Sequence, residues 1–324
     1  MEIKNIAPLA QSVKANIAQL LIGKDDQLEL VLVGLLAGGH VLLDDVPGTG
    51  KTVLAKSLAR SIDCKFARIQ FTADLLPSDI TGLNVYNQKA GEFEFQAGPA
   101  FTNILLADEI NRTTPRTQSA LLECMEEKQI TVDGETQKLD KPFFVIATEN
   151  PVETAGTFAL PEAQLDRFLL RLNLGYPNHS ESVTVLKNYL SGKGSNDIEL
   201  QPVATGAQIA EAQETVAQVR IDDVIVDYIV RLAEATRVHE DVALGVSTRG
   251  MLSMTRCCQA LAAIRGRDYV LPDDVKTLIG PVFTHRLILK TRYGSDQKGA
   301  EILERILNSV PAPTEDPGAK LPTA

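Results

Sequence analysis

The sequence has little cysteine and no long hydrophobic run. None of its cysteines has metal-ligand spacing, which predicts reduced thiols in a cytosolic protein; they are Cys64, Cys124, Cys257 and Cys258. The longest apolar run, residues 28–38, contains Glu29 and is about half as long as a membrane span. The first ten residues lack a basic segment followed by an apolar block, so we expect no secretory signal. These absences predict a cytoplasmic protein without a membrane span.

Positive charge is also scarce relative to negative charge. The 324 residues contain 32 Lys and Arg against 42 Asp and Glu, a formal net charge of −10. This balance disfavours sequence-independent binding of nucleic acid over the whole surface, although a local basic pore is compatible with it. At 44% hydrophobic and 23% charged residues, the chain is an ordinary globular sequence long enough for two domains.

A glycine-rich stretch, residues 42–52, begins in a predicted buried strand at residues 40–43 and leads directly into a predicted helix at 53–60. Strand, glycine loop and helix together bind phosphate, because loop N–H groups turn inward and the helix N-terminus carries partial positive charge. Gly48 and Gly50 allow that turn, Lys51 reaches the β and γ phosphates of a nucleotide, and Thr52 offers a hydroxyl to Mg²⁺.

One position departs from the usual G-x-x-x-x-G-K-[ST] pattern. Asp45 stands where the pattern has its first glycine. Asp tolerates unusual backbone angles better than most residues, and the flanking strand and helix argue against a chance match.

A second buried strand, residues 103–107, ends in Asp108 and Glu109. Asp108 can hold the water shell of Mg²⁺, and Glu109 can accept a proton from an attacking water. A third strand, residues 143–147, ends in Thr148-Glu149-Asn150, and ligands bind at the carboxyl ends of strands in open α/β sheets. These acids and polar groups predict the hydrolytic part of a nucleotide site.

One short segment has two interpretations. Ile22 and Gly23 follow an amphipathic helix and suit an adenine face, but they equally suit a helix-to-helix turn packed on the core.

Hairpins are predicted near residues 82–98 and 128–141, the second around an Asp133-Gly134 turn. After Tyr176 the pattern becomes helical and no strand alternation recurs. We therefore expect a core at 1–177, a helical domain at 178–309 and a disordered tail at 310–324.

Together these motifs resemble the MoxR branch of the AAA+ ATPases, and the resemblance covers residues 6–289. The stretches that carry it are 45–52 (DVPGTGKT), 69–82 (IQFTADLLPSDITG), 105–112 (LLADEINR), 148–151 (TENP) and 160–168 (LPEAQLDRF). Mg-chelatase ATPase subunits are a more distant match. The resemblance implies an α/β fold: an AAA+ P-loop αβα core with a parallel five-stranded sheet, plus a C-terminal all-α lid domain.

The resemblance also implies roles for particular residues. The loop Val46, Pro47, Gly48, Thr49, Gly50, Lys51 and Thr52 corresponds to the Walker A motif, with ATP as the ligand. Asp108 and Glu109 correspond to Walker B, so that Thr52 and Asp108 would hold Mg²⁺. Asn150 corresponds to the sensor that orients the attacking water. Glu149 stands where Gln is commoner, a departure that the sequence does not explain.

Two arginines would complete the site. Arg167 sits where related proteins supply an arginine finger to the neighbouring subunit, and Arg249, within Ser247-Thr248-Arg249, sits where the family has a second sensor on the γ phosphate. Thr248 replaces the usual proline there.

Other interpretations of these arginines remain open. Arg167 could pair with Asp166 or Glu162, Arg249 could cap its lid helix, and Arg112 or Arg116 could supply the intersubunit cation. His285 and Arg286 suggest a packed lid helix without a catalytic role.

The leading hypothesis is Mg-dependent ATP hydrolysis that drives remodelling, assembly or metal-cofactor insertion of partner proteins. The resemblance implies a ring homo-oligomer, hexameric in relatives, and partners with von Willebrand A domains. One alternative is a scaffold whose assembly is gated by ATP with little turnover. Another is a nucleic-acid motor or loader, which requires more cationic hairpin tips than this sequence provides.

Overall fold

A computed structural model describes residues 1–150, 157–191, 199–290 and 295–313. Residues 314–324, most of the expected disordered tail, lie outside the described residues, as does Pro151 of the 148–151 motif.

A parallel five-stranded sheet forms the centre of the molecule, as expected. The strand order is β2-β5-β8-β1-β9, and every neighbouring pair is parallel. The strands are β1 (Val41–Asp44), β2 (Phe66–Gln70), β5 (Ile104–Asp108), β8 (Phe144–Glu149) and β9 (Leu170–Leu172). Because β1 lies between β8 and β9, the glycine loop that follows β1 emerges inside the sheet rather than at its margin.

Helices cover both faces of this sheet, so the core has three layers. Side chains of β1 alternate between the faces: Val41 and Leu43 pack in one hydrophobic cluster and Leu42 in the other. The first cluster includes α1 (Ile6–Ala18), α2 (Asp25–Leu36) and α3 (Lys51–Ser61), after the short turn η1 (Ile3–Asn5). The second includes α4 (Pro77–Thr81) and α5 (Pro115–Glu127), with η2 (Ile110–Arg112) and α6 (Glu162–Leu165) nearby.

The C-terminal part is a helical lid that also contains one very short pair of strands. Its helices are α7 (His179–Leu190), α8 (Gly206–Val216), α9 (Asp223–Val238), α10 (Thr248–Ile264), α11 (Pro272–Phe283), η3 (Thr284–Arg286) and α12 (Ser295–Ser309). The strands β10 (Val242–Leu244) and β11 (Ile288–Leu289) pair antiparallel. With three and two residues, they are too short to produce a visible alternation in the sequence.

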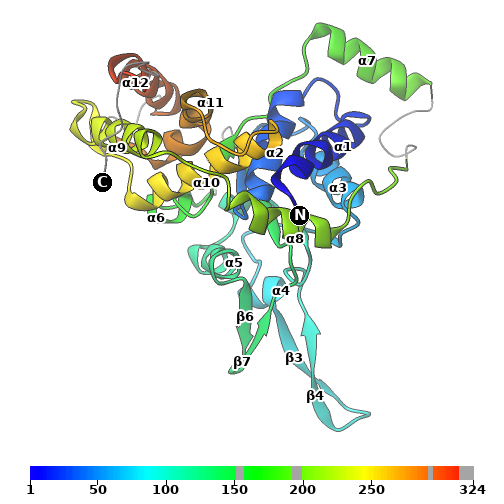
Figure 1. Cartoon of the computed structure of the whole chain (residues 1–324). Coiled ribbons are helices and arrows are strands. Elements are labelled where there is room, and N and C mark those ends of the chain that lie inside the picture. The colour runs from blue at the N-terminus through cyan, green and yellow to red at the C-terminus, as the bar shows by residue number, and fades with distance from the viewer. Residues whose placement is uncertain (151–156, 192–198, 291–294, 314–324) are drawn as a thin grey trace.

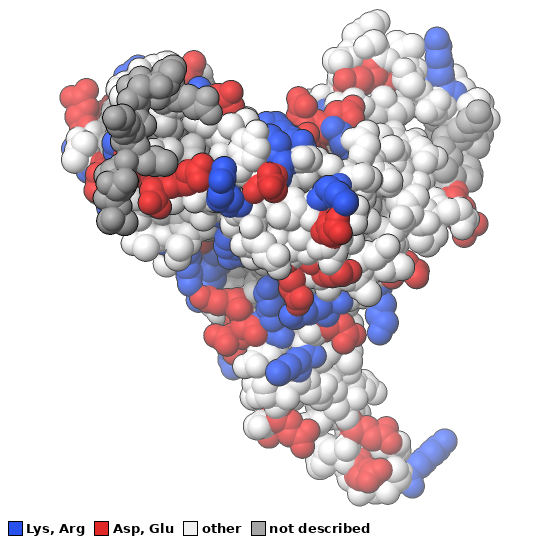
Figure 2. Space-filling model, in the orientation of Figure 1, with Lys and Arg blue, Asp and Glu red and all other residues white. Residues whose placement is uncertain are grey.

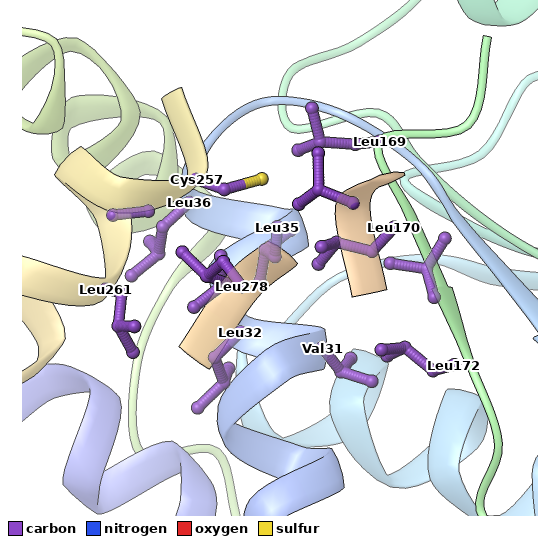
Figure 3. Close-up of a cluster of buried hydrophobic side chains, with 14 of the residues drawn as sticks. Val31, Leu32, Leu35, Leu36, Leu169, Leu170, Leu172, Cys257, Leu261 and Leu278 are labelled. Atoms are coloured by element: carbon purple, nitrogen blue, oxygen red, sulfur yellow. The ribbon is translucent and has the colours of Figure 1, made fainter. Parts of the chain in front are cut away.

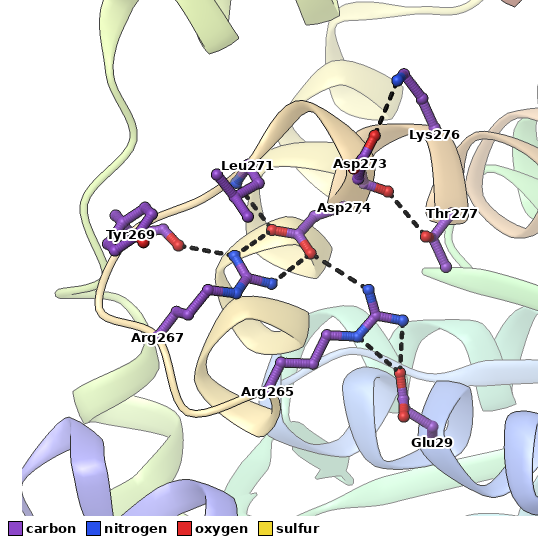
Figure 4. Close-up of polar contacts among 9 residues, drawn as sticks. All are labelled: Glu29, Arg265, Arg267, Tyr269, Leu271, Asp273, Asp274, Lys276 and Thr277. Atoms are coloured by element: carbon purple, nitrogen blue, oxygen red, sulfur yellow. Dashed lines mark hydrogen bonds and ion pairs between the residues drawn. The ribbon is translucent and has the colours of Figure 1, made fainter. Parts of the chain in front are cut away.

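The lid shares its hydrophobic core with the sheet domain. Figure 3 shows Leu35 of α2 between Leu170 of β9 and Leu278 of α11, with Leu32 of α2 below Leu278. Polar contacts reinforce this packing (Figure 4): Arg265 at the end of α10 contacts Glu29 of α2 at 2.9 Å. Further contacts fix the buried Asp274 of α11, to which Arg267 donates two hydrogen bonds of 2.8 and 2.7 Å. The lid helices α10 and α11 are therefore held firmly against α2.

Three parts of the chain project from this body (Figure 1). The hairpin of β3 (Gly82–Asn87) and β4 (Glu92–Ala97) extends away from it, beside the shorter hairpin of β6 (Gln129–Val132) and β7 (Glu135–Lys138). Helix α7 lies on the opposite side of the molecule from α9, α11 and α12, and none of its residues is buried. Among the described helices, none combines the length and the apolar character that a bilayer span requires.

Candidate active site

The glycine loop joins β1 to α3 directly. Gly50 is the N-cap of α3 with φ of 97°, and Gly48 has φ of 86°, values that favour glycine. The Lys51 ammonium lies over the loop and donates hydrogen bonds to the carbonyls of Asp45 at 2.7 Å and Val46 at 3.2 Å. The glycine loop, Lys51 and the N-terminus of α3 therefore lie together in the arrangement that the sequence predicts for a phosphate site.

Asp45 has a role that the sequence did not reveal. Its carboxylate is 2% exposed and accepts the backbone N–H groups of Leu174 at 2.5 Å and Gly175 at 2.9 Å. Burial raises the pKa of this carboxyl, and the two N–H bonds and Lys51 oppose that rise. Asp45 has a negative φ, so its position does not need glycine. The departure from the usual motif thus ties the loop to the segment that leads into the lid.

The acids that follow β5 adjoin the end of β8. Thr148 donates its hydroxyl to Asp108 at 2.7 Å and accepts the N–H of Glu109 at 2.8 Å. Arg68 of β2 donates to the other oxygen of Asp108 at 2.6 Å. Asp108 is 8% exposed, so these bonds compensate the burial of its charge.

Glu109 lies in a strained backbone conformation. Its φ is 58° and its ψ is 52°, in the left-handed region that non-glycine residues rarely adopt. Its carboxylate accepts a hydrogen bond from Gln70 at 2.8 Å and contacts Arg112 at 3.1 Å. Arg112 is thus engaged by Glu109, whereas Arg116 is exposed on α5.

The remaining polar residues of β8 reach the same edge. The Glu149 carbonyl accepts the N–H of Asp45 at 3.3 Å, and the next residue, Asn150, is 7% exposed. Nothing in these contacts explains why an acid stands at Glu149. The carboxyl ends of β1, β5 and β8 thus gather Lys51, Asp108, Glu109 and Asn150, because adjacent parallel strands end at one edge.

A cavity of about 250 Å³ adjoins the glycine loop. It is lined by residues 19–22, Lys24, 48–50, Val53 and Pro177, and by Val185, Asn188 and Tyr189 of α7. Ile22 therefore lies beside the loop, and Gly23, with φ of 73°, packs against Glu181 of α7. The sequence did not identify the α7 residues, because their spacing is simply that of an amphipathic helix.

Arg167 and Arg249 lie together at the other end of the strands. They line a cavity of about 340 Å³ with residues 38–40, which precede β1, and Leu169, which precedes β9. The glycine loop follows the carboxyl end of β1. Lys51 therefore lies at the carboxyl ends of the strands, and the two arginines lie at the opposite, amino-terminal ends. Neither arginine can reach a phosphate bound by the loop of its own chain in this arrangement.

Both arginines pair with Glu126 of α5. Glu126 contacts Arg167 Nε through Oε2 at 3.1 Å and Arg249 Nη2 through Oε1. Arg167 therefore pairs with neither Asp166 nor Glu162, the partners considered from the sequence. Glu126 was not identified from the sequence, since an exposed acid near a helix end carries no distinctive signal.

Arg286 is buried and holds the segment that carries Arg167. It donates to the Asp166 carboxylate at 2.7 Å and to the carbonyls of Phe168 at 2.7 Å and Leu169 at 3.3 Å. Burial lowers the pKa of Arg286, and Asp166 opposes that effect. The packing role expected for His285 and Arg286 therefore extends to the segment next to Arg167.

A parallel sheet with a glycine loop after the internal strand β1 and an acidic pair at the end of β5 defines a P-loop nucleotide hydrolase. The model of the ATPase family associated with various cellular activities (AAA) matches residues 40–170, and an AAA lid model matches residues 234–306.

Similar proteins extend this comparison over the whole chain. The uncharacterized protein YeaC of Bacillus subtilis is 48% identical over 96% of this chain and 97% of its own length. Chaperone MoxR1 of Mycobacterium tuberculosis is 40% identical over 92% of this chain and 80% of its own. A crystal structure from Cytophaga hutchinsonii, of a protein assigned as an ATPase, superposes with a TM-score of 0.87 at 37% identity and covers 96% of both chains.

The chain belongs to the MoxR family of AAA+ ATPases. It is an ATP-hydrolysing enzyme of a chaperone-like family, with the α/β core and helical lid of that class.

Proposed function

We propose that this protein is a Mg²⁺-dependent ATPase that works as a ring, in which each subunit binds ATP and its neighbour completes the catalytic site. The observation that carries the proposal is the separation of Lys51 from Arg167 and Arg249 across the sheet. We call the end of the sheet near Arg167 and Arg249 the arginine edge, and the opposite end, which carries the glycine loop, the loop edge. A head-to-tail contact between copies places the arginine edge of one subunit against the loop edge of the next. Such a contact forms a ring when its rotation closes, and the family resemblance implies a hexamer.

The loop edge supplies the groups that bind nucleotide. Residues 46–52 surround the phosphates, and Ile22, Gly23 and the apolar face of α7 enclose the base. Thr52 and Asp108 provide a hydroxyl and a carboxylate oxygen, donors that suit Mg²⁺, which keeps several waters and phosphate oxygens as ligands. When bound, Mg²⁺ neutralises charge on the phosphates.

The catalytic groups then have distinct tasks. Glu109 accepts the proton of the attacking water, and Asn150 orients that water. Arg167 and Arg249 of the neighbouring subunit stabilise the charge that develops on the γ-phosphate oxygens in the transition state. An arginine finger raises the rate about 10³- to 10⁵-fold in comparable phosphoryl-transfer enzymes.

The projecting hairpins are the parts that act on a partner. Tyr86 and Phe93 lie 52% and 71% exposed on the long hairpin, with ring centroids 5.3 Å apart. Acidic and basic side chains are mixed on the face shown in Figure 2, including the projecting hairpins. Exposed aromatic rings without a dense basic patch favour a protein partner over nucleic acid. We propose remodelling of proteins with von Willebrand A domains, in the cytoplasm.

Mixing two inactive variants tests the proposal. Arg167→Ala subunits keep their loop and Glu109, and Glu109→Gln subunits keep their arginines. We expect each variant alone to lose ATP turnover, by about 10³-fold or more for Arg167→Ala. Mixed rings should regain turnover. A complete site forms where the glycine loop and Glu109 of an Arg167→Ala subunit meet the arginines of a neighbouring Glu109→Gln subunit. Wild-type activity that is independent of protein concentration in dilute solution, or mixtures without recovery, would contradict the proposal.

A further inference from the structure

We propose that Glu126 is a positioning residue that holds Arg167 and Arg249 as one unit facing the neighbouring subunit's nucleotide. This inference rests on the proposed function, in which both arginines act on the neighbouring subunit. It concerns the chain's own geometry: a single carboxylate on a core helix fixes one arginine from the core and one from the lid.

The atoms used in these contacts leave the arginines competent to bind phosphate. Glu126 contacts Arg167 at Nε, so within the described residues both terminal nitrogens of Arg167 remain available. Glu126 contacts Arg249 at Nη2, which leaves the other nitrogens of that guanidinium available to bind phosphate. The side chains of Arg167 and Arg249 are 32% and 48% exposed, so they are accessible to an approaching subunit. Arginine binds phosphate oxygens best through such a free planar fork.

Electrostatics explains why a shared carboxylate is needed. Two guanidinium groups brought to one cavity repel each other, and the repulsion grows as water is excluded. Glu126 lies between them and offsets that repulsion with one negative charge, which leaves the cluster a net positive charge. Without the carboxylate the two side chains would separate and would have to be ordered again at each encounter with phosphate.

The backbone around Arg167 is fixed independently of Glu126. Arg286 of the lid binds Asp166, Phe168 and Leu169, and Ser247 donates to the second oxygen of Asp166 at 3.2 Å. Ser247 is the N-cap of α10, the helix that carries Arg249. Since these contacts place the two arginine backbones, Glu126 is left with one task, the direction of the side chains. Its loss should therefore change catalysis more than folding.

Glu126→Gln in otherwise wild-type rings gives the first test. Glutamine keeps the shape of the side chain but removes its charge. We expect kcat for ATP to fall about 10- to 100-fold, the scale set by a misplaced catalytic group, while KM changes little. The matched control is Glu123→Gln, an exposed acid one turn earlier on α5, which should leave both parameters unchanged. The melting temperature and ring assembly of both variants should match the wild type.

Mixed rings locate the effect in one subunit. The working site in the mixture of Arg167→Ala and Glu109→Gln subunits takes its arginines from the Glu109→Gln subunit. Glu126→Gln added to that subunit should abolish most of the recovered turnover. The same substitution added to the Arg167→Ala subunit should leave the recovered turnover unchanged.

The outcomes separate this inference from the proposed function. If the original mixture shows no recovery, the trans action of Arg167 is wrong, and the inference falls with it. If recovery occurs but Glu126→Gln reduces it equally from either subunit, the role of Glu126 is merely structural. The inference is also wrong if Glu126→Gln does not reduce the recovered turnover from either subunit. A raised kcat in the single Glu126→Gln variant would overturn it too, because Glu126 would then restrain the arginines.

Discussion

The carboxylate of Asp45 accepts the backbone N–H of Gly175 at 2.9 Å, which connects the nucleotide loop to the segment entering the lid. Its other oxygen accepts the N–H of Leu174 at 2.5 Å. A glycine at position 45, as in the usual motif, cannot make these bonds. In this protein the loop and the start of the lid are therefore held by one buried side chain.

Asp45→Gly should destabilise the protein even though it restores the usual motif. The substitution leaves the buried N–H of Leu174 and the half-buried N–H of Gly175 without their acceptor, which costs about 1–3 kcal/mol in the free energy of unfolding. Urea denaturation measures this change. Asp63→Gly is the control, because Asp63 is exposed and already has φ of 48°, so glycine fits there. Equal stability of Asp45→Gly and the wild type would show that the bonds to Leu174 and Gly175 contribute nothing.

Gly23→Ala should weaken ATP binding by displacing the Glu181 side chain and opening the capping box of α7. A Cβ at this position would lie 2.0 Å from Cδ of Glu181, whose side chain closes the capping box at the start of α7. The left-handed backbone at φ of 73° adds strain for any residue with a Cβ. A loss of about 1 kcal/mol corresponds to a roughly fivefold higher Kd, measurable by titration calorimetry with the non-hydrolysing Glu109→Gln protein.

Gly91→Ala is the matched control for this change. Gly91 has φ of 75° at the tip of the long hairpin, and a Cβ added there would have no other atom within 4 Å. The backbone strain is then the same without the clash against α7. If both variants bind ATP as tightly as the wild type, α7 does not contribute to the nucleotide cavity.

Acidification should destabilise the protein through His40. Burial lowers the pKa of this imidazole from 6.5 to about 4, and the nearby Lys128 and Arg256 act in the same direction. Nδ1 accepts the N–H of Val145 at 3.0 Å, so Nε2 carries the proton and bonds to the Met125 carbonyl at 3.0 Å. Protonation of Nδ1 would break the bond to Val145.

The sign follows from the two pKa values. Between about pH 4 and pH 6.5 the unfolded state binds a proton that the folded state does not, so stability falls as pH falls through this window. From about pH 7.5 to about pH 5.5, His40 should cost about 1 kcal/mol of unfolding free energy, measured with urea. His40→Gln should show a smaller drop over the same range, while buried His285 contributes equally to both proteins. An identical drop in both proteins would exclude His40 as the source.

The sequence predicted which residues lie together beside the glycine loop, for a simple physical reason. Phosphate binding needs glycines, a lysine and a hydroxyl in one continuous stretch. Asp108 ends a buried strand, and Glu109 and Asn150 each directly follow one. Parallel neighbouring strands end at one edge, so local patterns were enough to bring these residues together.

The arginine edge and the base cavity could not be predicted in the same way. Glu126 meets Arg249 across 123 positions of sequence, and Gly175 meets Asp45 across 130. An exposed acid on a helix has no pattern that distinguishes a surface ion pair from a support for catalytic groups. The same holds for α7, whose amphipathic spacing does not indicate that it covers Gly23.

The sequence by itself determined the class of protein and named the residues proposed to bind phosphate, because both depend on short contiguous motifs. Only the tertiary structure decided which charged groups face one another: it set Arg167 and Arg249 around Glu126, away from Lys51, and fastened Asp45 to the lid entrance. Such pairings depend on how helices pack against the sheet and the lid, and packing brings together residues that no local pattern relates.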